Sequence, residues 1–289
     1  MPTSPLHEPV LVWFAQHARD LPWRRPGTRP WEVMVSEVML QQTPVARVTP
    51  VWLTWMARWP TPAALAAEPP GKAVRMWGRL GYPRRALRLH AAAVEVVARH
   101  GGVLPTTYGG LRSLPGVGDY SAAAVASFAF GARHVVLDTN VRRVLARAVG
   151  GVAQPGASVT AAERLVAESV LPEEPAVAAR WAVAVMELGA LVCTAASPAC
   201  GGCPVASQCA WRAAGFPAYD GPVRRAQAFA GTDRQVRGLL LAVVREADGP
   251  VGAKTLLPVW AEDSQRERAL ASLVSDGLLV AGGGTYRLP

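Results

Sequence analysis

The apolar residues of this chain recur at helical spacing, and an alternating strand pattern is almost absent before residue 212. The pattern predicts a short helix at residues 10–18 and a longer one at residues 31–42, with an irregular loop rich in Trp, Pro and Arg between them. Alanine-rich helices of moderate length follow. They are interrupted at Pro60, Pro69-Pro70-Gly71, Gly101-Gly102, Pro115-Gly116 and Gly150-Gly151. The core is therefore predicted to be all-α.

A different pattern begins near Gly231, after glycines, prolines and paired arginines that indicate a linker, which we place at residues 222–230. Residues 231–289 are predicted to form helices at 233–247, 253–260 and 263–276, and a short hairpin through Gly282-Gly283-Gly284. Three helices and a hairpin are typical of a winged-helix-like domain. Such a domain can bind DNA or pack on the core, and the sequence leaves both possibilities open.

The length and composition agree with a folded protein of two domains. The chain has 289 residues, of which 51% are hydrophobic and 18% charged, so wholesale disorder is excluded. The apolar stretches are far shorter than a membrane span needs, and residues 1–10 lack the pattern of a secretory signal. We therefore expect a soluble cytoplasmic protein with no membrane partner.

The positive charge of the chain indicates a polyanionic partner. The formal net charge is +9, and residues 40–150 carry fourteen Lys or Arg against four Asp or Glu. Only Lys72 and Lys254 are lysines, so arginines, which form bidentate contacts with phosphate, supply nearly all of the positive charge.

All four cysteines fall within one short segment: Cys193, Cys200, Cys203 and Cys209, spaced C-x6-C-x2-C-x5-C. Disulfides are not expected in a reducing cytoplasm. Four thiolates on one loop suit a tetrahedral zinc ion or an iron–sulfur cluster, because either one neutralises their mutual repulsion. The spacing alone leaves both metals open.

Two carboxylates are candidates for acid–base chemistry. Glu37 has mostly apolar helical neighbours, so its carboxyl is expected to be partly desolvated, with a raised pKa suited to a general acid. A Glu whose tip reaches solvent or caps a neighbour is the equal alternative. Asp138 precedes an arginine-rich helix predicted at 139–149, where a helix N-cap is favoured over a carboxylate that faces a developing positive charge.

A Gly-rich turn precedes another alanine-rich helix. In Leu114-Pro115-Gly116-Val117-Gly118 the two glycines can present consecutive backbone N–H groups at the start of that helix, a geometry that binds phosphate. An ordinary tight turn between helices explains the same residues.

Together, these segments resemble the helix-hairpin-helix DNA glycosylases that carry a 4Fe-4S loop, and most closely the adenine glycosylases of the MutY family. The resemblance covers residues 10–212 in family order. It rests on Leu21-Pro22-Trp23-Arg24, Ser36-Glu37-Val38-Met39-Leu40-Gln41-Gln42-Thr43, Leu80-Gly81-Tyr82, Leu114 to Gly118, Leu137-Asp138-Thr139-Asn140-Val141-Arg142-Arg143-Val144 and Met186-Glu187-Leu188-Gly189-Ala190.

The resemblance implies a mainly α fold with a glycosylase core at residues 1–221. A six-helix domain with the hairpin would occupy about 25–135, and a 4Fe-4S cluster domain would combine the N-terminal helix with 136–221. The four cysteines would then hold a 4Fe-4S cluster, with zinc as the runner-up.

The resemblance also implies roles for individual residues. Glu37 would protonate a flipped adenine at N7, and Asp138 would stabilise the oxocarbenium-like sugar, with water completing the hydrolysis. The remaining implied site residues are Asn140 in the catalytic set, Gln42 and Tyr82 as the wedge, Trp23 and Arg24 as pocket lining, and Gly116 and Gly118 on DNA.

Tyr120 distinguishes between reactions within the superfamily, because bifunctional relatives that resemble endonuclease III carry a Schiff-base lysine at this position. We therefore expect a monofunctional hydrolase in base excision repair that acts as a monomer in the nucleoid, on double-stranded DNA with adenine opposite 8-oxoguanine or guanine. The alternatives are a thymine-mismatch or other base glycosylase, and an iron–sulfur DNA-binding protein without activity.

Two features depart from the family pattern. Val183 stands where many members have a Gln or Glu that helps to read adenine, so adenine selection would rest on other contacts. Residues 231–289 are also too few for the Nudix-like domain that commonly reads the opposite base.

Overall fold

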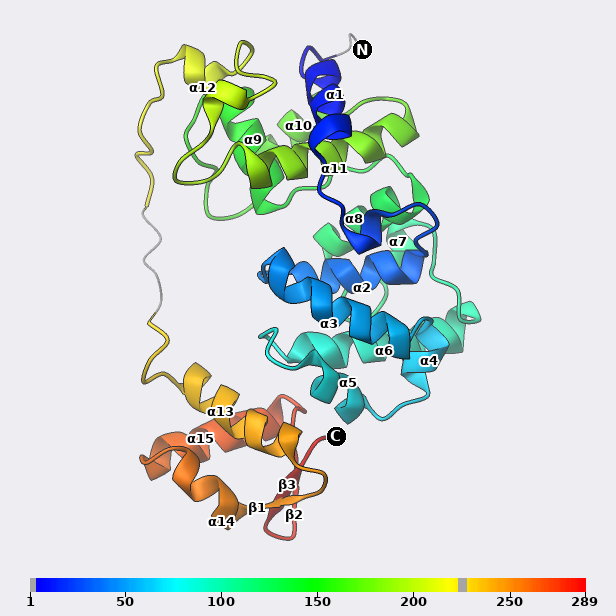
Figure 1. Cartoon of the computed structure of the whole chain (residues 1–289), viewed down its shortest axis with the longest axis vertical. Coiled ribbons are helices and arrows are strands. Elements are labelled where there is room, and N and C mark those ends of the chain that lie inside the picture. The colour runs from blue at the N-terminus through cyan, green and yellow to red at the C-terminus, as the bar shows by residue number, and fades with distance from the viewer. Residues whose placement is uncertain (1–3, 223–227) are drawn as a thin grey trace. The chain divides into compact units, whose positions relative to one another are not determined.

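The computed structural model describes residues 4–222 and 228–289, which are mainly helical (Figure 1). The predicted helical fold is confirmed, and none of the described helices is long and apolar enough to cross a membrane. By its internal contacts the chain divides into two units. The first contains Met1–Met34, Thr106–Ser113 and Val117–Val223, and the second contains Val35–Pro105, Leu114–Gly116 and Arg224–Pro289. The predicted domain bounds stay a prediction.

The first unit is a helical assembly around a core of Val, Leu, Ala and Trp side chains. Residues of α1, α9 and α11 such as Trp13, Val144 and Leu188 form this core. The elements are α1 (His7–His17), η1 (Pro22–Arg24), α7 (Tyr108–Arg112), α8 (Asp119–Phe130), α9 (Thr139–Ala148), α10 (Ala161–Ser169), α11 (Pro175–Leu191), η2 (Cys200–Gly202) and α12 (Ala210–Ala213).

The first helix is longer than its apolar pattern predicts. We expect it to begin at residue 10, whereas α1 begins at His7. Pro9 lies in the first turn, where its missing N–H costs no hydrogen bond, so the proline is compatible with the earlier start.

The second unit combines the helices that follow α2 (Pro30–Leu40) with the C-terminal module, which we define as residues 231–289. Three fully buried tryptophans, Trp55, Trp59 and Trp77, pack edge to face in its core, with ring centroids 4.7 Å apart for Trp55–Trp59 and 5.8 Å for Trp55–Trp77. The helices are α3 (Val45–Arg58), α4 (Pro62–Ala66), α5 (Pro70–Trp77) and α6 (Arg84–His100).

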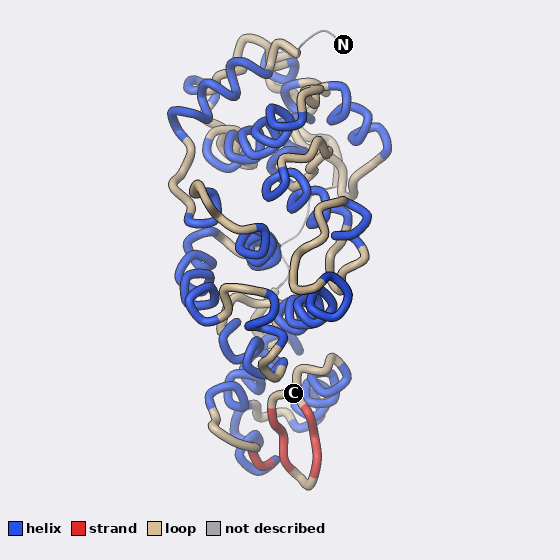
Figure 2. Tube along the Cα trace, turned by 90° about the vertical axis from the view of Figure 1, so that its right-hand side faces the viewer, coloured by secondary structure: helices blue, strands red, loops and turns tan. Residues whose placement is uncertain are grey.

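The C-terminal module has the predicted winged-helix order. It contains α13 (Asp233–Glu246), β1 (Val251–Gly252), α14 (Ala253–Leu256), η3 (Leu257–Val259), α15 (Asp263–Ser275), β2 (Val280–Gly282) and β3 (Thr285–Arg287). The strands form an antiparallel sheet in the order β1-β3-β2, drawn red in Figure 2. The predicted helix at 253–260 is wrong in its second half, because Pro258 has no N–H to donate and the chain becomes a 3-10 turn.

The sequence pattern missed β1, whose two residues are too short to show alternation. The predicted linker at 222–230 includes residues 223–227, which lie outside the described residues.

Candidate functional site

Glu37 lies in α2, on a face that the sequence predicts to be buried. Its side chain is 6% exposed, and Met34 and Val38 beside it are buried as well. The predicted burial of Glu37 is confirmed, and its role as a general acid stays a prediction. Glu37 belongs to the second unit and Asp138 to the first.

Asp138 is the N-cap of α9, as predicted. Its Oδ1 accepts hydrogen bonds from the backbone N–H of Asn140 at 2.9 Å and of Val141 at 2.6 Å, and its Oδ2 accepts one from Asn140 Nδ2 at 2.9 Å. Burial raises the pKa of Asp138 above its usual range, while these hydrogen bonds and the charge of Arg143 act in the opposite direction. The cap therefore fixes the carboxylate on both of its oxygens.

Arg143, which the sequence identifies only as one of several arginines in this helix, extends the network. Its Nη2 donates to Asn140 Oδ1 at 2.7 Å and to the carbonyl of Gly189 at 2.6 Å, and its Nε donates to the carbonyl of Cys193 at 2.6 Å. Burial lowers the pKa of Arg143. A continuous set of hydrogen bonds thus joins the cysteine loop, α11 and the Asp138 carboxylate.

Gly189 is required for the close approach of α9 and α11. A Cβ at this position would lie 2.7 Å from Asn140 Cβ and 2.8 Å from the Asn140 carbonyl oxygen, which is too close for any other residue. The glycine of the Met186–Ala190 motif therefore sets the position of the helix that carries Asp138 and Asn140.

Tyr120 lies on α8, directly after the Gly118 N-cap and Asp119. It lines a surface hollow together with Tyr108, His134 and Leu137, the residue before Asp138. The lining residues described there include arginines and a histidine but no lysine. A Schiff-base amine is therefore absent from the described lining of this hollow.

Gly116 makes the turn that the sequence predicts. It has φ of +76°, and a Cβ there would lie 2.5 Å from the Arg88 Cβ on α6. Both the left-handed backbone and the tight packing require glycine. Gly118, the N-cap of α8, has extended backbone and open space where its Cβ would be.

Gln42 and Tyr82, the predicted wedge, lie on two turns of the second unit. Both side chains are exposed, and Tyr82 retains 49% of its accessible surface. Both residues have left-handed backbone, with φ of 58° for Gln42 and 48° for Tyr82. Thr43 Oγ1 donates to the Leu80 carbonyl at 3.2 Å, so a hydrogen bond ties one turn to the other.

Arg24 forms an ion pair with the buried carboxylate of Glu187 in the first unit. Its Nη1 donates to Glu187 Oε2 at 2.9 Å, and Arg19 donates to both Glu187 oxygens from Nε at 2.7 Å and from Nη2 at 2.8 Å. Burial by itself would raise the pKa of Glu187, but the hydrogen bonds from Arg19 and the charge of Arg24 outweigh it and lower the pKa to about 2. Trp23, the other predicted lining residue, is 5% exposed.

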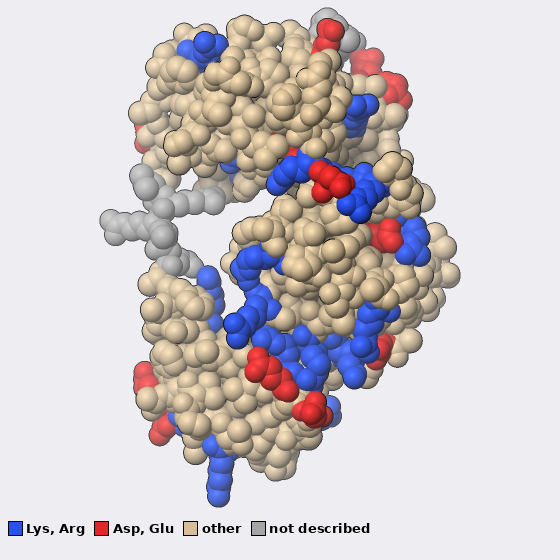
Figure 3. All heavy atoms as spheres, viewed as in Figure 1, with Lys and Arg blue, Asp and Glu red and all other residues tan. Residues whose placement is uncertain are grey.

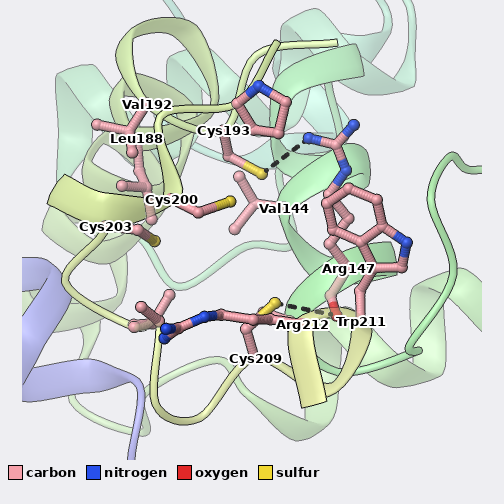
Figure 4. Close-up of a pocket in the computed structure, with 14 residues that line it drawn as sticks. Val144, Arg147, Leu188, Val192, Cys193, Cys200, Cys203, Cys209, Trp211 and Arg212 are labelled. Atoms are coloured by element: carbon pink, nitrogen blue, oxygen red, sulfur yellow. Dashed lines mark hydrogen bonds between the residues drawn. The ribbon is translucent and has the colours of Figure 1, made fainter. Parts of the chain in front are cut away.

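The four cysteines line one hollow in the first unit. Figure 4 shows their sulfur atoms turned toward the same space, which is closed by Val144, Leu188 and Trp211. Arg147 Nη1 donates to Cys193 Sγ at 3.4 Å, and Cys209 Sγ donates to the Arg147 carbonyl at 3.6 Å. Burial raises the pKa of the Cys193 and Cys203 thiols.

The chemistry of this donor set fits a metal group. Four soft sulfur donors line this one hollow, and such donors suit zinc or an iron–sulfur cluster. The Arg147 guanidinium lies 4.6 Å from the Trp211 ring centroid and contacts Cys193, so its charge can offset that of thiolates. Among the described residues, no three His, Cys, Asp or Glu side chains lie close enough together to hold a single metal ion.

Positive side chains gather on the surface of the second unit (Figure 3). Arg47, Arg79, Arg84 and Arg88 are exposed and lie within the segments that flank Gln42 and Tyr82. Arg47 donates to the Arg79 carbonyl, which holds these two arginines together. This confirms a basic surface in the region where the sequence concentrates positive charge.

The chain is similar to known DNA repair proteins. The model of the family described as "HhH-GPD superfamily base excision DNA repair protein" matches residues 35–168. The chain is 51% identical over 282 residues to the adenine DNA glycosylase of Mycobacterium tuberculosis, an alignment that covers 97% of this chain and 92% of that protein. It is 52% identical over 281 residues to the adenine DNA glycosylase of Mycolicibacterium smegmatis, covering 96% and 93%.

The solved structure of a thermostable thymine-DNA glycosylase has the same fold. It aligns with a TM-score of 0.63 at 24% identity and covers 72% of this chain and 94% of that chain. The predicted helix-hairpin-helix fold is confirmed.

Proposed function

The chain belongs to the family of adenine DNA glycosylases, and we propose that it excises adenine paired with 8-oxoguanine or guanine from double-stranded DNA by monofunctional hydrolysis. Its activity as a DNA glycosylase of base excision repair follows from the family. What we propose beyond the family is the identity of the base opposite the adenine and the roles of individual residues. The observation that carries it is the Asp138 carboxylate, which is held on both oxygens at the start of an arginine-rich helix.

Glu37 is the general acid of this proposal. A protonated adenine leaves the sugar far more readily than a neutral one, and the acid must hold its proton near neutral pH. Burial of the Glu37 side chain in α2 supports this role, because burial disfavours a charged carboxylate.

Asp138 stabilises the positive charge that develops on the sugar as the bond to adenine breaks. A carboxylate held by two backbone N–H groups and Asn140 does not need to reorganise during the reaction, which is the condition for effective electrostatic stabilisation. Asn140 thereby orients the second oxygen and acts as a positioning residue through Asp138.

Tyr120 supports hydrolysis by water rather than strand cleavage. A phenol on α8 cannot form a Schiff base with the sugar, so the product is an intact strand with an abasic site.

Gln42 and Tyr82 support extrusion of the adenine. Removing a base from the duplex costs about a few kcal/mol, which wedge residues recover by filling the vacated space. The exposed arginines Arg47, Arg79 and Arg88 provide phosphate contacts beside them.

The cysteine hollow is proposed to hold a 4Fe-4S cluster, which takes four thiolate ligands. When bound, the group supplies metal–thiolate bonds that hold residues 193–209 in place. Arg147 neutralises part of the thiolate charge at Cys193, and Arg143 holds the Cys193 carbonyl. Purified protein should be brown, with about four iron atoms per chain. A colourless protein with one zinc ion would contradict this assignment.

The function is tested with labelled duplexes that place adenine opposite 8-oxoguanine, guanine, cytosine or thymine. We expect breaks at adenine opposite 8-oxoguanine and guanine, and only after alkali, because the enzyme leaves the strand intact. Breaks without alkali, or release of thymine in place of adenine, would contradict the proposal.

Two substitutions test the carboxylates. Asp138→Asn keeps the helix cap and removes the charge, and Glu37→Gln keeps the shape and removes the acid. Each should slow excision by about a hundredfold or more while DNA binding persists. Asp248→Asn, at an exposed position of the C-terminal module, serves as the matched control.

A further inference from the structure

The two wedge residues share an unusual backbone. Among the described residues, Gln42, Tyr82 and Phe216 are the non-glycine positions with positive φ. Left-handed backbone at such residues costs about 1–3 kcal/mol each, so surrounding contacts must impose it. Two of these three positions carry the proposed wedge.

Arg85 supplies the contacts that hold both turns. Its side chain is 6% exposed, and its guanidinium donates five hydrogen bonds to oxygens of two separate segments. Nη1 donates to the carbonyls of Val38 at 2.8 Å, Met39 at 3.0 Å and Gln41 at 2.6 Å, and Nη2 donates to Thr43 Oγ1 at 2.9 Å and the Gly81 carbonyl at 3.0 Å.

These acceptors lie on either side of the wedge positions. The Val38 and Met39 carbonyls belong to the last turn of α2, where helix carbonyls lack partners within the helix, and Gln41 directly follows that helix. Thr43 follows Gln42, and Gly81 precedes Tyr82, so each wedge residue is flanked by an acceptor of the same guanidinium.

Arg85 also contacts the Tyr82 ring. The guanidinium carbon lies 5.5 Å from the centroid of Tyr82 and 5.1 Å from that of Trp77. The Trp77 Nε1 donates to the Gly81 carbonyl at 2.9 Å, so this oxygen receives two hydrogen bonds. The direction of the Tyr82 side chain is thus coupled to the same cation that fixes the Gln42 turn.

We propose that Arg85 is a positioning residue that sets the Gln42 and Tyr82 turns in register, so that both side chains enter the duplex together as the adenine leaves. The inference rests on the wedge role within the proposed function. Only a planar guanidinium with several N–H donors can bind oxygens of both turns at once. A lysine at this position would keep the charge but would no longer hold the two turns in a fixed relative position.

The inference predicts a defect confined to base extrusion. A paired adenine must be driven out of the helix, whereas an adenine opposite an abasic site has no partner base to leave. Loss of register should therefore slow excision of a paired adenine far more than excision of an adenine opposite an abasic site.

The experiment measures single-turnover excision by the full-length protein from two duplexes, one with adenine opposite 8-oxoguanine and one with adenine opposite an abasic site. Arg85→Lys is compared with wild type and with Arg99→Lys, an exposed arginine on the same helix α6. The ratio of the two rates is taken within each preparation, so the fraction of folded protein cancels.

For Arg85→Lys we expect the ratio of paired to unpaired rates to fall by about tenfold or more, which corresponds to about 1.4 kcal/mol. Tyr82→Ala should lower the ratio in the same direction, and Arg99→Lys should leave it unchanged. An unchanged ratio in Arg85→Lys overturns the inference, whether or not the overall rate falls. Wild-type protein that releases no adenine from either duplex overturns the proposed function instead.

Discussion

Glu187 offers the sharpest test of the electrostatics of the first unit. Its carboxylate has no exposed surface and receives hydrogen bonds from Arg19 and Arg24. Replacing it with Gln keeps the volume and removes the charge, which leaves two arginines without their anion. We expect Glu187→Gln to lower the free energy of unfolding.

The magnitude follows from the pKa. A pKa of about 2 in the folded protein, against an ordinary value of 4.5, corresponds to about 3 kcal/mol of stabilisation, because each pKa unit is worth about 1.4 kcal/mol. Removal of one partner from a buried ion pair typically lowers the free energy of unfolding by about 3–5 kcal/mol, which agrees with the value from the pKa. For a unit of this size the melting temperature should fall by about 6–12 °C.

The stabilisation by Glu187 should depend on pH in a definite direction. The folded pKa of Glu187 lies below the unfolded one, so the stabilisation is fully present above pH 4.5 and is lost as the pH falls toward 2. The difference in melting temperature between wild type and Glu187→Gln should therefore be constant from pH 8 to 5 and should narrow below that.

The assay is thermal unfolding followed by circular dichroism, with Glu168→Gln as the control. Glu168 forms a half-exposed ion pair with Arg133, so the same chemical change there should cost less than about 1 kcal/mol. A fall of less than 2 °C for Glu187→Gln, or a difference between the two proteins that changes between pH 8 and 6, would refute the reasoning.

Three further substitutions test packing and metal binding. Gly189→Ala should lower the free energy of unfolding by about 1–3 kcal/mol and slow adenine excision without weakening DNA binding, because the new Cβ would displace Asn140. Unchanged excision would show that this packing is not needed. Gly71→Ala should speed proteolysis of the C-terminal module, since its Cβ would lie 2.4 Å from the carbonyl oxygen of Pro289, and equal rates for Gly71→Ala and wild type would contradict this. Cys203→Ser should lower the iron content below that of wild type by elemental analysis, and full iron occupancy would remove Cys203 from the ligand set.

The parts of the molecule that the sequence predicts are those encoded locally. The Asp138 cap needs only an Asp before a helix, Gly116 needs only a turn, and the four cysteines lie within one segment. The buried face of α2 likewise follows from the spacing of its apolar residues, which places Glu37 among them.

Arg85 and Arg143 could not be found this way. Their partners are mostly backbone carbonyls, which every residue possesses. The distant ones lie 44–47 positions away in sequence from Arg85 and 46–50 positions away from Arg143. When an arginine binds backbone carbonyls, the sequence contains no particular residue type that would identify its partners. The one available signal was position, because Arg143 lies within a motif that the sequence analysis identified and Arg85 lies three residues after another.

The C-terminal module packs on α5 and α6, which is one of the two possibilities that its sequence left open. Arg75 donates to the carbonyls of Arg245 and Ala247, and Arg245 Nη1 donates to the Gly78 carbonyl at 2.6 Å. Asp276 pairs with Arg84 at 3.1 Å, immediately after the wedge turn. Since Gly78 and Arg84 bracket Tyr82, the module contacts both sides of the turn that carries this proposed wedge residue.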